Sequence, residues 1–192
     1  SNLIISVGEW VLRTACNQLK AWRSDGVKRE WTVAVNVSAK QFHDVQFVSC
    51  VCRHLEATGA PAGKLRIEIT ESSMQVDVEQ TIVKMKALRA LGVRFSLDDF
   101  GTGYSSLSYL KRLPLDQLKI DRSFVSDVNV DASDAAIVRT ILSLAEHLHL
   151  DVVAEGVETL AQKQLLLSHG CPAFQGYHFG RPVPVEMLGN QI

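Results

Sequence analysis

Four acidic residues that could bind a metal ion are spread along this 192-residue chain: Glu68, Asp98, Asp99 and Glu155. Each lies at the end of a short run rich in apolar and β-branched residues, which is the pattern of a buried β-strand. Four carboxylates gathered at one site would repel each other unless cations balanced them. Oxygen ligands without Cys or His favour Mg²⁺ or Mn²⁺, and Ca²⁺ could also bind.

The adjacent carboxylates of Asp98 and Asp99 suggest two metal ions, one of them bridged. A two-metal site suits in-line attack at phosphorus, because one ion activates water and the other stabilises the leaving oxygen. Lys119 lies at the end of another strand pattern and could orient the attacking water or neutralise phosphate charge. Asn36 and Gln175 add polar groups at two further strand ends. These residues predict metal-dependent phosphoester hydrolysis and leave the substrate open.

The elements that position these residues alternate between strand and helix patterns. Strand patterns occupy Trp31–Val37, Leu65–Thr70, Val93–Leu97, Leu115–Ile120, Asp151–Ala154 and Ala173–Tyr177. Helical spacing of apolar residues occupies Val7–Trp22, Gln41–Thr58, Val78–Leu91, Ser105–Arg112, Ser133–Leu150 and Thr159–His169. We expect Ser133 and Thr159 to be the N-caps of the last two helices.

Strands that alternate with crossover helices predict an α/β fold with a parallel sheet. No G-x-G-x-x-G follows the first strand, so a dinucleotide-binding fold lacks its main signal. The other common outcome is the TIM-like (β/α)8 barrel, whose active sites lie at the C-terminal ends of the strands. Such barrels have eight strands in about 250 residues. The six strand patterns therefore predict one domain over residues 1–192, an N-terminally incomplete barrel lacking its first two strands.

The composition limits the partners and the compartment. A net charge of -1 gives no global basic field to attract a nucleic-acid polymer. No membrane segment or signal peptide is present in the sequence, so we expect a cytoplasmic domain, tethered to a membrane only through other domains. The four cysteines form no C-x-x-C pair and no Cys/His cluster of zinc spacing, so we interpret them as buried, reduced thiols. The six histidines are interpreted as surface or packing residues.

Short motifs follow one another through nearly the whole chain, and the run DDFGTGYSSL at 98–107 is the most specific of them. The others are Asn36-Val37-Ser38 with Gln41-Phe42, Glu68-Ile69-Thr70-Glu71, Lys119-Ile120-Asp121, Glu155-Gly156-Val157-Glu158, and Gln175-Gly176-Tyr177 through Arg181-Pro182. In order and spacing these motifs resemble the EAL family of cyclic di-GMP phosphodiesterases.

The resemblance implies hydrolysis of the bacterial second messenger cyclic di-GMP to linear pGpG with two Mg²⁺ or Mn²⁺ ions. It implies that the metal ligands are Asn36, Glu68, Asp98, Asp99 and Glu155, with Asp98 between the two ions. It also implies that Asp99, Lys119 and Glu155 are catalytic. Glu155 would be the general base, and Lys119 would hold the attacking water.

The same resemblance implies substrate contacts from Gln175, Asp121 and Arg181. It implies that Glu71 supports the loop of Gly101, Thr102 and Gly103, which in this family couples the site to dimerisation. From the residues alone, the glycines of this loop fit either a phosphate cradle or a hinge. A homodimer through the loop and helix after Asp99, and further signalling domains in the full-length protein, are also implied.

One departure from the family pattern concerns its naming motif, Glu-Ala-Leu followed by an Arg, which is absent. In the family this motif lies on the second barrel strand, where the Glu binds metal and the Arg contacts substrate. The strand count finds the same gap, so we expect this chain alone to be weakly active or inactive. A catalytically silent cyclic di-GMP receptor and an inactive truncated fragment remain as alternatives.

Overall fold

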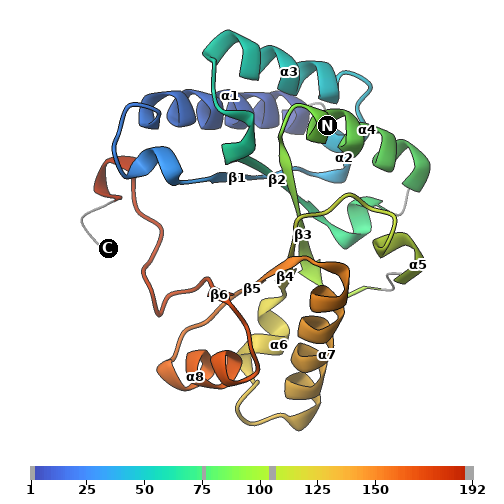
Figure 1. Ribbon diagram of the computed structural model, residues 1–192, viewed down its shortest axis with the longest axis vertical. Coiled ribbons are helices and arrows are strands. Elements are labelled where there is room, and N and C mark those ends of the chain that lie inside the picture. The colour runs from blue at the N-terminus through green and yellow to red at the C-terminus, as the bar shows by residue number, and fades with distance from the viewer. Residues whose placement is uncertain (1–2, 75–76, 104–106, 189–192) are drawn as a thin grey trace. The chain divides into compact units, whose positions relative to one another are not determined.

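The computed structural model describes residues 3–74, 77–103 and 107–188, which form two compact units. Unit 1 comprises Ser1–Asp98 and Gly103–Asp116, and unit 2 comprises Asp99–Thr102 and Gln117–Ile192. Within each unit, parallel strands alternate with helices along the chain (Figure 1). This is the pattern that the sequence predicts, with six strands in the described residues.

The strands of unit 1 pair in chain order and run parallel. They are β1 (Val33–Asn36), β2 (Leu65–Thr70) and β3 (Arg94–Phe100). Their apolar side chains form the core of the unit, in which Ile67, Ile69 and Leu97 are inaccessible to solvent. Strand β3 continues beyond the predicted end at Leu97 because Asp98 still pairs with β2, opposite Thr70.

The helices of unit 1 are α1 (Leu3–Trp22), α2 (Ala39–His43), α3 (Phe47–Thr58), α4 (Val78–Ala90) and α5 (Leu107–Leu110). Helix α1 packs against β1 and β2 and lies beside α3 (Figure 1). The single helix predicted over Gln41–Thr58 is wrong, because α2 and α3 are separated. Asp44 adopts an extended ψ of 136° after α2, and its carboxylate accepts a hydrogen bond from the Gln46 N–H at 2.7 Å. The part of predicted helix Ser105–Arg112 before residue 107 lies outside the described residues.

The start of α2 is a capping box formed by Ser38 and Gln41. The Ser38 hydroxyl accepts the Gln41 N–H, and the Gln41 Oε1 accepts the Ser38 N–H at 3.1 Å. The rest of the Gln41 amide lies directly over Gly8 of α1. An ideal Cβ at residue 8 would come within 1.3 Å of the Gln41 Nε2. Gly8 therefore provides the space in which Gln41 caps α2.

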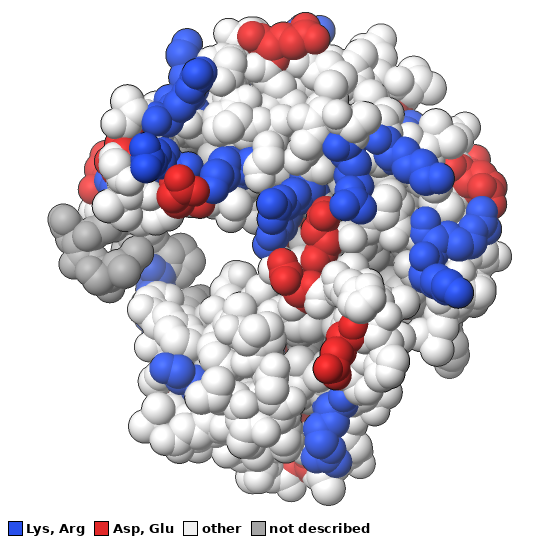
Figure 2. All heavy atoms as spheres, viewed as in Figure 1, with Lys and Arg blue, Asp and Glu red and all other residues white. Residues whose placement is uncertain are grey.

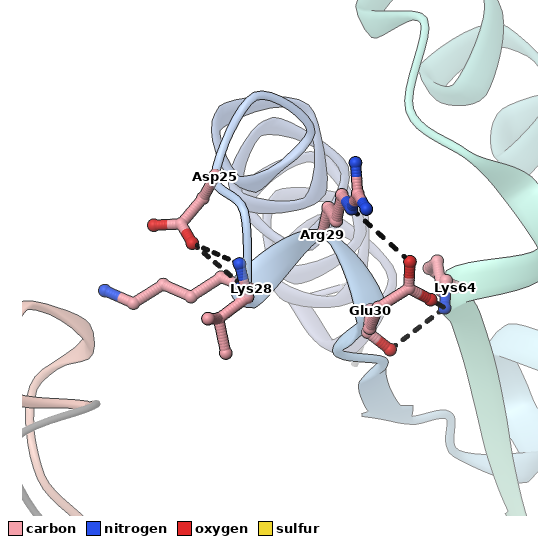
Figure 3. A network of polar contacts seen from close by, with 6 residues as sticks. Asp25, Lys28, Arg29, Glu30 and Lys64 are labelled. Carbon is pink, nitrogen blue, oxygen red and sulfur yellow. Dashed lines mark hydrogen bonds and ion pairs between the residues drawn. The ribbon is translucent and has the colours of Figure 1, made fainter.

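A polar network holds the chain between α1 and β1, where a 3₁₀ helix spans Lys28–Glu30 (Figure 3). The carboxylate of Asp25 accepts the backbone N–H of Lys28 at 2.9 Å, which is the main cause that lowers the Asp25 pKa. Glu30 contacts Arg29 at 3.5 Å and Lys64 at 3.0 Å. Lys64 belongs to the 3₁₀ helix before β2, so the network connects the entries of two neighbouring strands.

The strands of unit 2 also pair in parallel and in chain order. They are β4 (Gln117–Ile120), β5 (Asp151–Ala154) and β6 (Ala173–Phe174). The helices are α6 (Arg122–Ser126), α7 (Ala132–Leu148) and α8 (Leu160–Ser168), and α7 packs against β4 and β5. The core includes Leu118, Ile120 and Ala154, which are fully buried. Strand β6 is shorter than the predicted Ala173–Tyr177.

Two helix starts in unit 2 differ from the sequence prediction. Helix α7 is capped by Asp131, whose carboxylate accepts the Ser133 N–H at 2.7 Å, so the prediction of Ser133 as N-cap is wrong. Helix α6 is absent from the prediction. It has only five residues and one buried side chain, Val125, which leaves no periodic signal. Thr159 caps α8 in a capping box with Gln162, as predicted.

The surface charges and the burial of the cysteines can be compared with what the composition predicts. In the view of Figure 2, basic and acidic side chains are interspersed among uncharged residues. None of the described helices is both long enough and apolar enough to cross a membrane. The cysteines form no disulfide; Cys16 and Cys171 are buried as predicted, whereas Cys50 and Cys52 are half-buried.

Candidate functional site

Three of the predicted metal ligands share one face of the strands of unit 1. Asn36 pairs with Glu68, and Glu68 pairs with Ser96, so these side chains project to the same side of the sheet. Asp98 lies two residues beyond Ser96 and therefore projects to that side as well. Glu68 and Asp98 are only 7% and 9% exposed, whereas Asn36 is exposed. The strand register thus places one amide and two carboxylates along neighbouring strand ends.

Unit 2 brings Lys119 and Glu155 together as a buried ion pair. The Lys119 Nζ lies 2.5 Å from the Glu155 Oε1, and the two side chains are 5% and 17% exposed. Lys119 pairs with Val153, and Glu155 is two residues further along, so both project to the same side. The Glu155 N–H donates to the Ile120 carbonyl at 3.1 Å and extends the β4–β5 ladder by one residue.

Asp99 and Asp121 add two carboxylates to this part of unit 2. One carboxylate oxygen of Asp99 and one of Glu155 lie within 4.8 Å of each other. Asp99 has a φ of 53°, a left-handed conformation that Asp tolerates better than most residues. Burial acts to raise the pKa of Asp121, but hydrogen bonds from the Ser123 hydroxyl and N–H, and from the Asp99 side chain, lower it overall.

The loop after Asp99 is closely packed at its glycines. An ideal Cβ on Gly101 would lie 2.9 Å from the Phe124 ring, and one on Gly103 would lie 2.7 Å from the Glu71 Oε1. Thr102 donates hydrogen bonds from its N–H and its hydroxyl to the Asp99 carbonyl, the latter at 2.9 Å. Glu71 is buried against Gly103, so the residue predicted to support this loop does contact it.

The segments that follow β5 and β6 are joined by backbone hydrogen bonds. The Val157 N–H donates to the Gln175 carbonyl at 3.0 Å, and the Gln175 N–H donates to Ala154 at 2.8 Å. An ideal Cβ on Gly176 would lie 2.1 Å from the Val157 carbonyl oxygen, so no side chain fits there. The Gln175 side chain is exposed beside this joint.

Arg181 is exposed, and its guanidinium lies 4.6 Å from the centre of the Tyr177 ring. This distance is typical of a cation–π contact. The sequence analysis assigned no role to Tyr177. Its position in the Gln175-Gly176-Tyr177 motif could have indicated that it contacts another residue of the same segment.

Glu155 and Glu158 have different environments, which separates two carboxylates that the sequence leaves ambiguous. Glu158 is exposed and forms an ion pair with Arg122 at 2.7 Å, and the side-chain cap of α8 is Thr159. Glu155 is the one that approaches Asp99 and Lys119.

The donors of each unit are of the kind that a hard divalent cation prefers. Unit 1 offers one amide and two carboxylates, and unit 2 offers Asp99 and Glu155. None of these groups is a thiol or an imidazole, and carboxylate and amide oxygens suit Mg²⁺, Mn²⁺ and Ca²⁺.

Parallel β/α units with acidic residues at their strand ends define the class of this protein as a TIM-like barrel domain. The family model described as "EAL domain" matches residues 1–182, and the chain belongs to this family. The expected fold class, an EAL-type barrel represented by six strands in the described residues, is confirmed by the structural matches below.

The chain is similar to relatives that are named as cyclic di-GMP phosphodiesterases. It is 47% identical over 188 residues to the "Bifunctional diguanylate cyclase/cyclic di-GMP phosphodiesterase MucR" of Pseudomonas aeruginosa, which covers 98% of this chain and 27% of that protein. The solved structure "PaMucR Phosphodiesterase, c-di-GMP complex" has a TM-score of 0.93 and 46% identity, covering 97% of this chain and 75% of the other.

A more distant structure was solved with a metal. It is the "Klebsiella pneumoniae BlrP1 pH 9.0 manganese/cy-diGMP complex", with a TM-score of 0.80 and 32% identity, covering 94% of this chain and 44% of the other. The chain spans about a quarter of the length of the curated relatives it matches, with 27% and 24% for two of them.

Proposed function

We propose that this domain hydrolyses cyclic di-GMP to linear pGpG with Mg²⁺ or Mn²⁺. The observation that carries the proposal is the largely buried ion pair of Lys119 and Glu155, whose Nζ and Oε1 atoms are 2.5 Å apart. A carboxylate oxygen of Asp99 lies within 4.8 Å of one of Glu155. Relatives named as cyclic di-GMP phosphodiesterases and solved complexes with cyclic di-GMP support the choice of substrate.

The proposed metal ligands are Asn36, Glu68, Asp98, Asp99 and Glu155. Divalent cations bound there would activate water and stabilise the charge that develops on the leaving oxygen. The chain's own residues hold the reactants. Lys119 orients the attacking water and neutralises phosphate charge, and the Glu155 carboxylate accepts the proton of that water. Because both side chains are nearly inaccessible to solvent, their electrostatic effect is stronger than it would be in water.

The proposed substrate contacts come from Gln175, Asp121 and Arg181. Arg181 suits a phosphate or a guanine edge, because a guanidinium forms paired hydrogen bonds to either. Thr102 donates two hydrogen bonds to the Asp99 carbonyl and so supports its left-handed conformation, and Glu71 would support the loop at Gly103. The exposed Leu107 and Tyr109 of α5, 61% and 47% accessible, are apolar groups that a homodimer through this region would cover. We also propose that residues 1–192 form one domain of a longer protein that contains other signalling domains. The proposed location is cytoplasmic, and the reduced thiols fit that compartment.

The test uses the full-length protein, because we expect this chain alone to be weakly active or inactive. It compares pGpG release by the wild type with release by its Lys119→Met and Glu155→Gln variants, with Mg²⁺ or Mn²⁺ present. We expect turnover by the full-length wild type and strong loss of turnover in both variants, with cyclic di-GMP binding weakened but still measurable in Lys119→Met. Equal turnover in wild type and variants would refute the assigned roles. Binding of cyclic di-GMP by the wild type without any cleavage would favour the receptor function instead.

A further inference from the structure

Three side chains on the outer helices of unit 1 bring a carboxylate, a thiol and an imidazole together. Glu9 lies on α1, and Cys50 and His54 lie on α3. The two α3 residues are four positions apart and therefore occupy the same face of the helix. One ligand atom from each of the three residues lies within 4.8 Å of the others. The strand-end carboxylates take no part in this cluster.

The imidazole of His54 lacks a hydrogen bond at the nitrogen that faces this cluster. His54 is 9% exposed, and its Nε2 has no hydrogen-bond partner among the residues that the structure describes. The Glu9 Oε1 lies 3.6 Å from it, beyond the length of a hydrogen bond. A buried polar atom without a partner is energetically unfavourable, so the Nε2 atom would gain from binding a ligand.

The three donor types select a particular kind of ligand. A thiolate and an imidazole favour Zn²⁺ over Mg²⁺ or Ca²⁺, and one carboxylate is a common third ligand. Zinc binds such atoms at about 2.0–2.3 Å, which brings tetrahedral ligands to about 3.5 Å from one another. The cluster needs to contract by about 1 Å to reach that geometry. Rotation of the Glu9 side chain, which is 46% exposed, can shorten its distances to Cys50 and His54, and rotation about the Cys50 and His54 side-chain bonds must supply the rest.

A small cavity beside Glu9 and Cys50 offers room for a water ligand. It has a volume of about 80 Å³, and its walls include Glu9, Cys50, Gln46 and Arg53. A polar cavity needs only about 10–15 Å³ of this measure to hold one water molecule. We propose that Glu9, Cys50 and His54 bind a zinc ion between α1 and α3, with water from this cavity as the fourth ligand.

Arg53 occupies part of this site in the metal-free chain. Its Nη2 lies 2.9 Å from the Glu9 Oε1, and its side chain also hydrogen-bonds the Cys50 thiol. The Arg53 and Glu9 side chains are 64% and 46% exposed, and an ion pair of this kind contributes little stability. A cation already resides between two of the ligands, and zinc displaces it. Burial raises the pKa of the Cys50 thiol, so zinc binding releases a proton from it.

The inference does not depend on the proposed function, because the two sites use different donor atoms. Cobalt(II) reports the difference: bound to a thiolate, it gains a charge-transfer absorption that carboxylate ligands do not produce. The titration is made with excess Mg²⁺ present to fill the strand-end carboxylates. We expect one equivalent of Co²⁺ to produce the band in the wild-type protein and Zn²⁺ to abolish it.

Cys52 provides a matched control, since it lies on the same helix and is half-buried like Cys50. We expect Cys52→Ser to keep the cobalt–thiolate band and Cys50→Ser to lose it. His54→Gln should weaken zinc binding at least about tenfold, because loss of a partner that only supports a ligand already costs ~10–100-fold. A band that persists in Cys50→Ser, or no band in the wild type, overturns the proposal.

A second measurement needs no variant and so covers the case in which one fails to fold. The wild-type protein is alkylated with iodoacetamide with and without Zn²⁺, and modification of each cysteine is followed by fragment-ion mass spectrometry. We expect Zn²⁺ to slow alkylation of Cys50, to leave Cys52 unchanged, and to lose its effect when EDTA is added. Equal protection of both thiols, or of neither, overturns the proposal.

Discussion

The strand ends and the outer helices of this protein each gather potential metal ligands, but with different chemistry. The strand-end set contains only carboxylate and amide oxygens, whereas Glu9, Cys50 and His54 combine oxygen, sulfur and nitrogen. Hard and soft donors select different metals, so one chain can hold Mg²⁺ or Mn²⁺ at one place and Zn²⁺ at another. The difference teaches that donor type identifies the ion, and that acidity alone does not.

The strand-end residues and the helix cluster would not be independent if one substitution affected both. Asp99→Asn keeps the side-chain volume and tolerates the left-handed backbone, so it tests the carboxylate alone. We expect it to lower the Mg²⁺-dependent rate of pGpG release at least about 1,000-fold, because the carboxylate proposed as a metal ligand and catalytic group is lost. The measurement is turnover of cyclic di-GMP at saturating metal.

The reciprocal substitution completes this test. Cys50→Ser should leave the Mg²⁺-dependent rate unchanged and remove the cobalt–thiolate band, whereas Asp99→Asn should do the reverse. Loss of turnover in Cys50→Ser with the fold intact would show that the two sites are coupled.

Two alanine substitutions at glycines of unit 2 test how tightly the loop after β6 is packed against Val157. Gly176→Ala places a Cβ at 2.1 Å from the Val157 carbonyl, so the backbone must shift. We expect a loss of about 3 kcal/mol in the free energy of unfolding, at the upper end for overpacking. Gly170→Ala is the control: it has a φ of 86° with nothing within 4 Å and should cost only about 1–2 kcal/mol. Urea denaturation measures both, and equal losses would contradict the steric explanation.

The stability of unit 1 at alkaline pH should depend on Cys16 of α1. Burial and the neighbouring Cys50 raise the pKa of its thiol to about 11. The unfolded chain loses this proton near the ordinary value of 9.0, while the folded chain keeps it. The unfolded state therefore binds fewer protons between these values, and stability falls as the pH rises through this window. Cys16→Ala should reduce the loss by up to about 2–3 kcal/mol.

The measurement is urea unfolding of both proteins at neutral pH and near pH 11, with Cys52→Ala as the control. Part of the alkaline loss should remain in Cys16→Ala, because burial also raises the pKa of Cys171. An identical pH dependence in wild type and Cys16→Ala would rule out this role for Cys16.

The smallest expected effect concerns the residue that competes with zinc. Arg53→Gln removes a guanidinium that lies 2.9 Å from the Glu9 carboxylate, so Zn²⁺ no longer has to displace it. The pair is exposed and worth about 0.2–1 kcal/mol, so affinity should rise by no more than about fivefold. Competition with a zinc-binding dye measures the change. Lower affinity in Arg53→Gln would mean that Arg53 supports the site.

Within each unit, the sequence predicts which polar residues share one side of the strands, because they lie near the ends of strand patterns. Asn36, Glu68 and Asp98 do so in unit 1, and Lys119 and Glu155 do so in unit 2. The helix cluster could not be predicted in this way, since Glu9 lies 41 residues before Cys50 and only the packing of α1 against α3 brings them together. The break between α2 and α3 was missed for a related reason: the Asp44 carboxylate fixes it locally while the apolar spacing continues.

The contact between Gly8 and Gln41 has a consequence for how this sequence can vary. A side chain at position 8 would occupy the place of the Gln41 amide, and a shorter residue at position 41 would remove the capping box of α2. A larger residue at position 8 therefore requires a shorter one at position 41. On a mutational path position 41 must shorten first, and the intermediate keeps the Ser38 half of the capping box while it loses the half supplied by the Gln41 side chain.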